Sequence, residues 1–156
     1  HRFRVTDGGF EEGFTGWRDG AFIEAFRPIQ SPGLGDALQA LSNELPWRLP
    51  PGYTSELNPA AAAWVSDIAR HLSRGLILLA DYGFPRAEFY HPERGMGTLM
   101  CHYRQRSHGD PLILPGLQDI TAHVDFTAVG EAALDAGLRV AGYTSQAAFL
   151  LNTGLL

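Results

Sequence analysis

Residues 58–83, NPAAAAWVSDIARHLSRGLILLADYG, decide the fold class because they join an amphipathic helix pattern to a purely apolar run. Asn58 is a candidate N-cap, Pro59 suits the first helical position, and large apolar side chains then recur at helical spacing. The apolar run at 76–80 is typical of a strand buried on both faces, as in parallel sheets. A helix followed by such a strand predicts an α/β fold.

The sequence after this unit repeats the same order. A helical pattern runs from Phe126 to Gly137, residues 139–144 have the composition of a strand, and Ser145 can cap a last helix. Between the two units, residues 84–118 are irregular around one short strand pattern. Their arginines are interpreted as a solvated loop surface: Arg86, Arg94, Arg104 and Arg106. Helix, strand, helix, strand is the order of an α/β domain.

The sequence before this unit predicts antiparallel structure instead. Residues 2–27 alternate between apolar and polar side chains and are interrupted by turn signals, which indicates a β meander. Asp36 can cap a short helix that follows. We therefore expect two parts, a β meander with a helical insert over residues 1–51 and αβ units over residues 52–156.

Composition excludes several classes of protein. The chain has 156 residues, 45% of them apolar and 19% charged, which suits one globular domain or a large part of one. A formal net charge of −5 argues against nucleic-acid binding. Cys101 is the only cysteine, so no internal disulfide can form. No membrane span or signal peptide is recognisable, and the start at His1 within a β-like run suggests a piece of a longer protein.

The stretch DITAHVDF, residues 119–126, places polar side chains at alternate positions, which share a face in an extended chain. These side chains are Asp119, Thr121, His123 and Asp125. They could bind a metal, although no HExxH or paired-cysteine spacing supports that reading. They could instead mark a helix entry with Asp125 as N-cap and His123 half-buried. In a third interpretation Asp119 and His123 face the same crevice as Asp81. Spacing alone favours the helix entry.

Glycine pairs give little support for a nucleotide loop. Gly33 and Gly35 precede a helix pattern, but Leu38 occupies the position of the third glycine. Gly95 and Gly97 precede a strand pattern, which favours a turn. Glu56, just before the clearest helix, is solvated or faces a site.

Several stretches, in order, resemble the MidA-type S-adenosylmethionine-dependent methyltransferases. The stretches are SELNP at 55–59, LADYG at 79–83, GTLMCHYR at 97–104, PGLQDITAHVDF at 115–126 and TSQAAFLLNTG at 144–154. The family includes the mitochondrial complex I assembly factor that methylates an arginine. The resemblance runs from about Gly52 to Gly154, whereas residues 1–51 match only loosely, at the position of the family's inserted region.

The resemblance implies the C-terminal part of a Rossmann-like class I methyltransferase sheet, preceded by an antiparallel β meander and helical insert. The family's glycine-rich cofactor loop and ribose-binding acid are expected upstream of His1, and a last strand beyond Leu156. The implied cofactor is S-adenosyl-L-methionine. The implied activity is protein arginine N-methylation linked to respiratory complex assembly, with this chain alone inactive. A respiratory-complex subunit is the implied protein substrate, and a homodimer is an open possibility. The implied compartment is the bacterial cytoplasm, or the mitochondrial matrix in a eukaryote.

The resemblance also suggests site residues. Carboxylates would clamp a planar guanidinium, and an aromatic or imidazole side chain would stack on it or accept its proton. The expected catalytic residues are Asp81, Asp119, His123 and Asp125. The expected substrate-binding residues are Glu56, Asn58, Tyr82, Gly83, Tyr103 and Arg104. No metal is expected. The alternatives are a non-catalytic interaction or assembly module and, third, a metal hydrolase using His123 and the acids.

Overall fold

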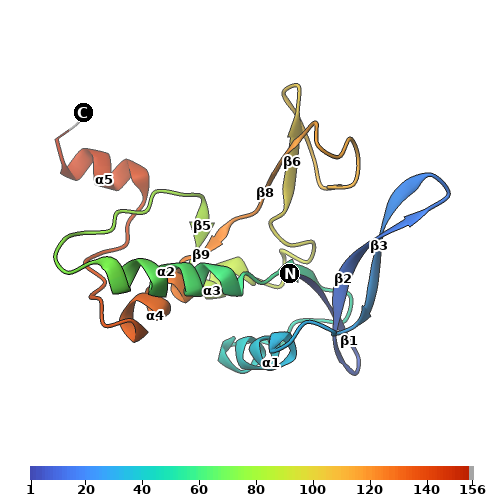
Figure 1. Ribbon diagram of the computed structural model, residues 1–156, viewed down its shortest axis with the longest axis horizontal. Coiled ribbons are helices and arrows are strands. Elements are labelled where there is room, and N and C mark those ends of the chain that lie inside the picture. The colour runs from blue at the N-terminus through green and yellow to red at the C-terminus, as the bar shows by residue number, and fades with distance from the viewer. Residues whose placement is uncertain (155–156) are drawn as a thin grey trace.

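The chain begins with an antiparallel sheet, as the alternating pattern predicts. The computed structural model describes residues 1–154 and shows this sheet at one end of an elongated molecule (Figure 1). A three-stranded meander is formed by β1 (Arg2–Thr6), β2 (Gly9–Arg18) and β3 (Ala21–Pro28). The short β4 (Thr54–Glu56) pairs with β1, which gives the order β3-β2-β1-β4. The sheet therefore draws residues from both sides of position 51.

Helix α1 (Leu34–Glu44) covers this sheet and completes the main core. Gly33, in the left-handed region with φ 75°, precedes the helix, and Asp36 lies in its first turn rather than at its cap. Leu34, Leu38 and Leu41 recur at helical spacing and are buried. They pack with side chains from β1, the loop before β4 and α3 (Arg86–Phe89), namely Phe3, Val5, Leu45, Leu49, Tyr53, Phe89 and Tyr90. Each such leucine contributes about 2 kcal/mol through burial.

Glu12 fixes the connection between the meander and α1. Its side chain extends from β2 and the residue is only 3% exposed. One carboxylate oxygen accepts hydrogen bonds from the backbone N–H groups of Gln30 and Ser31, both at 3.0 Å, and the other accepts from the Ser31 hydroxyl. The Ser31 hydroxyl, helped by the two N–H groups, lowers the pKa of Glu12 below its ordinary 4.5, although burial opposes this.

Replacing Glu12 by glutamine is expected to destabilise the protein by about 2 kcal/mol at neutral pH, because the charged acceptor is lost. The lowered folded-state pKa means that the contribution of Glu12 is fully present above its ordinary pKa of 4.5 and is lost as pH falls through the folded-state pKa. Denaturant unfolding of wild type and Glu12→Gln between roughly pH 3 and pH 7 should show a difference in the free energy of unfolding that narrows on acidification. Glu11→Gln is the matched control. A difference that does not vary with pH would contradict this role.

The second half of the molecule is built on two packed helices. Helices α2 (Pro59–His71) and α4 (Phe126–Asp135) lie side by side (Figure 1). Asn58 is the N-cap of α2, although its side chain accepts no hydrogen bond from the first turn. At the end of α4, Gly137 has φ 81° and its N–H bonds to the carbonyl of Leu134, a common helix ending. The last helix, α5 (Gln146–Asn152), is capped by Ser145 as predicted.

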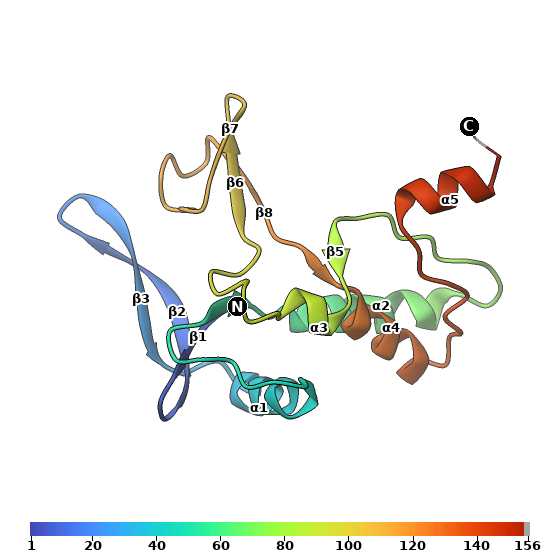
Figure 2. The ribbon, with the colours of Figure 1, turned by 180° about the vertical axis from the view of Figure 1, so that it is seen from behind.

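Two small sheets are formed by the chain between α2 and α4. The parallel pair consists of β5 (Gly83–Phe84) and β9 (Val124–Asp125). An antiparallel sheet in the order β7-β6-β8 forms an arm that stands away from the helices (Figure 2). Its strands are β6 (Met100–Tyr103), β7 (Arg106–His108) and β8 (Asp119–Thr121). Arg104 and Gln105, both with positive φ, make the tight turn at its tip.

The strands predicted at 76–80 and 139–144 are absent from the structure. Both segments are irregular, and apart from the half-buried Ile77 their apolar side chains are exposed: Leu76 is 75% exposed and Leu78 69%. Neither segment has a neighbouring strand among residues 1–154. An extended segment becomes a strand only when another backbone satisfies its N–H and C=O groups. The described residues therefore form neither the strand predicted at 76–80, which we expected to be buried on both faces, nor the strand predicted at 139–144.

Candidate functional site

Two of the quoted sequence motifs meet at the parallel pair β5–β9. Gly83 lies opposite Val124, and the Val124 N–H donates to the carbonyl of Tyr82 at 2.8 Å. Gly83 has no room for a side chain, because a methyl group there would overlap the carbonyl oxygen of Val124 and lie 2.7 Å from the Phe126 ring. The end of the LADYG motif thus lies beside the HVDF end of residues 119–126.

The alternating polar residues of 119–126 do not form one row. Asp119 and Thr121 belong to β8, which pairs with β6, and both are exposed on the arm. The chain then leaves that sheet at Ala122, and β9 pairs with β5 instead. His123 and Asp125 are half-buried near this second pair. A change of pairing partner within one stretch breaks the shared face that a continuous strand would have.

Asp125 acts as a helix cap and an ion-pair partner. Its Oδ1 accepts from the N–H groups of Thr127 and Ala128 at 3.0 and 3.1 Å, which confirms the predicted N-cap of α4. Its Oδ2 lies 3.4 Å from Nε of Arg86, whose own backbone N–H donates to the Thr127 hydroxyl at 2.9 Å. The Asp125 carboxylate is therefore already engaged by this chain.

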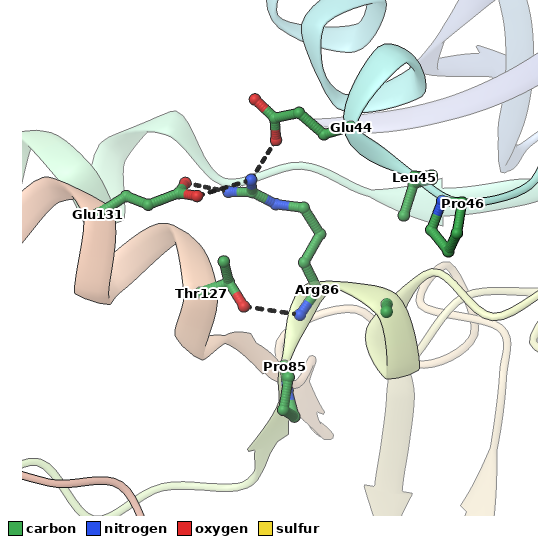
Figure 3. A pocket seen from close by; sticks show the side chains of 8 residues that line it. Glu44, Leu45, Pro46, Pro85, Arg86, Thr127 and Glu131 are labelled. Carbon is green, nitrogen blue, oxygen red and sulfur yellow. Dashed lines mark hydrogen bonds and ion pairs between the residues drawn. The ribbon is translucent and has the colours of Figure 1, made fainter.

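Arg86 joins three elements around an open pocket of about 370 Å³ (Figure 3). Its guanidinium contacts Glu44 at the end of α1 and Glu131 on α4, as well as Asp125. Burial disfavours the charged guanidinium, but the hydrogen bond to Glu131 and the charges of Asp125 and Glu44 outweigh it and raise the pKa of Arg86. The pocket lies just beyond the carboxyl ends of β5 and β9, where ligands bind in open α/β sheets. The Arg86 side chain is only 15% exposed, so the prediction that Arg86 belongs to a solvated loop surface was wrong.

A second polar cluster links Glu56 to His123. Oε2 of Glu56 accepts from the N–H of Thr98 at 2.8 Å and from its hydroxyl at 3.1 Å. The same hydroxyl accepts from the His123 N–H at 3.0 Å. Thr98 was not among the predicted site residues, although it lies in the quoted GTLMCHYR motif. A threonine after a glycine carries no local signal for such a role, because its partners are distant in sequence.

Aromatic packing holds the His123 side chain. Its ring lies edge-to-face on Phe84, with centroids 5.0 Å apart, and the Arg94 guanidinium lies over Phe84 at 4.1 Å. Nδ1 of His123 is buried and has no hydrogen-bond partner among the described residues. His123 is therefore held by ring packing on one side and by its backbone on the other.

The other predicted site residues lie apart from this cluster. Asp81 is exposed, and its Oδ1 accepts from the N–H of Tyr82 at 2.7 Å. Tyr82 is 82% exposed just before β5. Tyr103 and Arg104 lie at the tip of the arm, where the guanidinium is 5.2 Å from the ring. Asn58 is exposed at the start of α2. Of the ten predicted residues, Glu56 and His123 are linked through Thr98. Gly83 pairs with Val124 in β9, directly after His123.

Residues 1–154 offer no arrangement of three or more His, Cys, Asp or Glu side chains suited to a metal ion. Cys101 is fully buried and its pKa is raised by burial, which disfavours a thiolate nucleophile. Gly33 and Gly35 cannot form a free nucleotide loop, because the intervening Leu34 is buried in the core. Within the same residues, no helix has both the length and the apolar character required to cross a membrane.

Comparison with known proteins gives the family. A family model described as "Putative S-adenosyl-L-methionine-dependent methyltransferase" matches residues 1–144, and the chain belongs to this family. A crystal structure of a related protein from Burkholderia thailandensis, bound to S-adenosyl-homocysteine, is 44% identical with a TM-score of 0.88. A native crystal structure of an uncharacterised protein of the same superfamily and organism is also 44% identical, with a TM-score of 0.90. No curated protein matches.

The two crystal structures match nearly all of this chain, but this chain matches less than half of each of them. Each crystal structure covers 99% of this chain, so the similarity includes residues 1–51, which we expected to match only loosely. This chain spans only 38% and 40% of the two solved chains. The methyltransferase family is thus established for this chain, while the narrower MidA-type label stays a prediction.

Proposed function

We propose that the full-length protein is an S-adenosylmethionine-dependent methyltransferase and that these 156 residues form a C-terminal portion of it. The main support is the relative bound to S-adenosyl-homocysteine, which matches nearly the whole chain at 44% identity. S-adenosyl-homocysteine is the product that remains when S-adenosylmethionine has lost its methyl group. We place the cofactor cradle in parts of the full-length protein outside this sequence, because residues 1–154 show no free glycine-rich loop before a helix. This chain alone is then expected to be inactive.

The exposed apolar surface supports a Rossmann-like sheet completed by the rest of the protein. A compact 17.0 kDa monomer would expose about 7,700 Å², whereas this chain exposes 10,758 Å². Exposed large apolar side chains occur on the predicted strands and the segment after them, namely Leu76, Leu78, Leu79, Val140, Tyr143, Phe149 and Leu151. We propose that residues 76–80 and 139–144 become parallel strands when further strands of the same protein pair with them.

For the substrate we propose an arginine of a protein, with a respiratory-complex subunit as the candidate. A net charge of −5 and the exposed carboxylates of Asp81 and Asp119 favour a cationic substrate. In such a reaction the methyl carbon–sulfur bond breaks with its electron pair going to sulfur, a nitrogen–carbon bond forms, and the nitrogen releases one proton. The bound cofactor supplies the activated methyl group. The residues of this chain would position the nitrogen and accept the proton.

Within this chain we assign the proton acceptor to His123. Its half-buried imidazole lies near the junction of the two motifs and is fixed by Phe84. Asp81 and Tyr82, exposed at the start of β5, are the proposed contacts for the guanidinium. Asp125 is proposed to form the site wall through its ion pair with Arg86. Asp119, Asn58, Tyr103 and Arg104 would contact the surrounding protein substrate. We also propose a bacterial cytoplasmic or mitochondrial matrix location, with a homodimer as a possible assembly.

A direct test uses the full-length protein with methyl-labelled S-adenosylmethionine. We expect saturable S-adenosyl-homocysteine binding in calorimetry and labelled methylarginine in an extract from cells that lack the enzyme. Asp81→Asn should reduce transfer roughly tenfold or more and leave the fold intact, because Asp81 is exposed and bonds only to its neighbour. Asp7→Asn, in the first β-turn, is the control. Label on a different residue type would reject the arginine assignment, and unchanged transfer by Asp81→Asn would reject the role of Asp81.

A non-catalytic assembly module is the second candidate, because the exposed apolar area would also suit a protein partner. The same calorimetry separates the two. If the full-length protein does not bind S-adenosyl-homocysteine, the methyltransferase proposal fails and the assembly module is favoured.

A further inference from the structure

We infer that Thr98 is a positioning residue that ties the backbone of His123 to the carboxylate of Glu56. The inference rests on the proposed function, in which His123 accepts a proton. Three segments that are distant in sequence meet at this one side chain, namely the end of β4, the loop before β6 and the turn before β9.

The hydroxyl of Thr98 has the two roles that this link requires. A hydroxyl can donate one hydrogen bond while accepting others. Here it donates to Oε2 of Glu56 at 3.1 Å and accepts from the N–H of His123 at 3.0 Å. The backbone N–H of Thr98 donates to the same carboxylate oxygen at 2.8 Å. Since Thr98 is buried, water does not readily replace these bonds.

Glu56 is a fixed anchor for this link. Its backbone belongs to β4 opposite Arg2, and its carbonyl accepts from the Tyr90 hydroxyl at 3.0 Å. Its side chain is 13% exposed, and Oε1 makes no hydrogen bond to the described residues. The cation beside Oε1 is Nε of Arg2, 3.9 Å away, and Glu24 holds the Arg2 guanidinium through two 2.8 Å bonds. A buried carboxylate with these contacts is better suited to support neighbours than to bind a substrate directly.

Gly97 makes the approach of Glu56 possible. Its φ is 78°, in the left-handed region, and a methyl group on its Cα would overlap the Glu56 carboxylate. The Gly97-Thr98 pair therefore forms a cradle in which the glycine leaves space and the threonine supplies two donors.

The position of His123 depends on this cradle because few other bonds restrain it. Nδ1 has no hydrogen-bond partner within residues 1–154, and the ring is held by packing on Phe84. Loss of the Thr98 hydroxyl would free the His123 backbone just before β9. A displacement of about 1 Å at a reacting group can slow a reaction about a hundredfold. We expect a smaller loss, about tenfold, because Phe84 still restrains the ring.

The test compares Thr98→Val, which keeps the shape but loses the hydroxyl, with Thr98→Ser, which keeps the hydroxyl. Both are made in the full-length protein, with the exposed Thr15→Val as control. We expect Thr98→Val to lower the maximal rate of methyl transfer into cell extract about tenfold and to leave the KM for S-adenosylmethionine unchanged. Thr98→Ser should restore most of the rate. A rate in Thr98→Val equal to wild type, or an equal loss in both variants, would overturn the inference.

A second measurement does not depend on activity. In ¹⁵N-labelled full-length protein, the His123 amide proton should shift upfield in Thr98→Val and remain near its wild-type position in Thr98→Ser, because only the valine loses the acceptor. An unshifted His123 amide in Thr98→Val would overturn the inference. If wild type itself transfers no methyl group, the proposed function fails, and this signal alone decides whether Thr98 positions His123.

Discussion

Gly83→Ala is expected to cost at least about 3 kcal/mol of stability and to abolish methyl transfer by the full-length protein. The added methyl group would overlap the Val124 carbonyl oxygen and contact the Phe126 ring. The obstacle is backbone, so a rotamer change cannot relieve it. Either β5 and β9 separate, or the start of α4 moves. In both cases the bond from Val124 to the Tyr82 carbonyl is lost, and with it the contact between the two motifs.

Gly109→Ala is the matched control, because a methyl group at Gly109 meets no atom within 4 Å and its φ is not in the left-handed region. Urea unfolding of the two full-length variants should place Gly83→Ala far below wild type and Gly109→Ala close to it. Equal midpoints for Gly83→Ala and wild type would show that β5 and β9 do not approach as closely as described.

Local sequence patterns were sufficient to predict the elements whose hydrogen-bond partners lie close in sequence. The meander over residues 2–27 pairs with its own neighbours in sequence, so alternation and turn residues specify it. The caps Ser145 and Asp125 were also predicted correctly, because a cap bonds to N–H groups only two or three residues away. Such elements need no information from distant parts of the chain.

The strands at 76–80 and 139–144 illustrate the opposite case. Their composition suits a buried strand, but the structure of such a strand depends on neighbours that residues 1–154 do not provide. Sequence composition therefore indicates where a segment is stable once paired, not whether its partner is present. The same reasoning supports our proposal that these segments pair with other parts of the full-length protein.

The candidate site was predicted only in part, for a related reason. Alternation placed Asp119 and His123 on one face, but the chain changes sheets at Ala122, and nothing in the local pattern marks that change. Arg86 and Thr98 were missed as site components because their partners are distant in sequence: Glu131 lies 45 residues from Arg86, and Glu56 and His123 lie 42 and 25 residues from Thr98. Long-range polar contacts of this kind are set by the tertiary fold.

Arg86→Met is the second substitution with a large expected effect, about 3 kcal/mol of destabilisation. Methionine keeps much of the apolar stem but removes the charge that offsets three carboxylates. Asp125, only 12% exposed, would then be a buried charge without its cation, and it would lie near Glu131 and Glu44. Breaking a mostly buried pair from one side is costly because the remaining ion keeps its desolvation penalty. The contacts between α1, α3 and α4 should loosen together.

Arg70→Met is the control for the effect of burial on the ion pairs of Arg86. It removes an arginine from an exposed ion pair with Asp67 on α2. Exposed pairs of this type contribute little, so Arg70→Met should unfold in urea close to wild type while Arg86→Met unfolds well below it. Adding Asp125→Asn to Arg86→Met should recover part of the lost stability, since asparagine can still cap α4 but carries no charge. If the double variant is no more stable than Arg86→Met, an uncompensated charge at Asp125 is not the cause. The loss would then come from the packing of the Arg86 stem against the pocket wall.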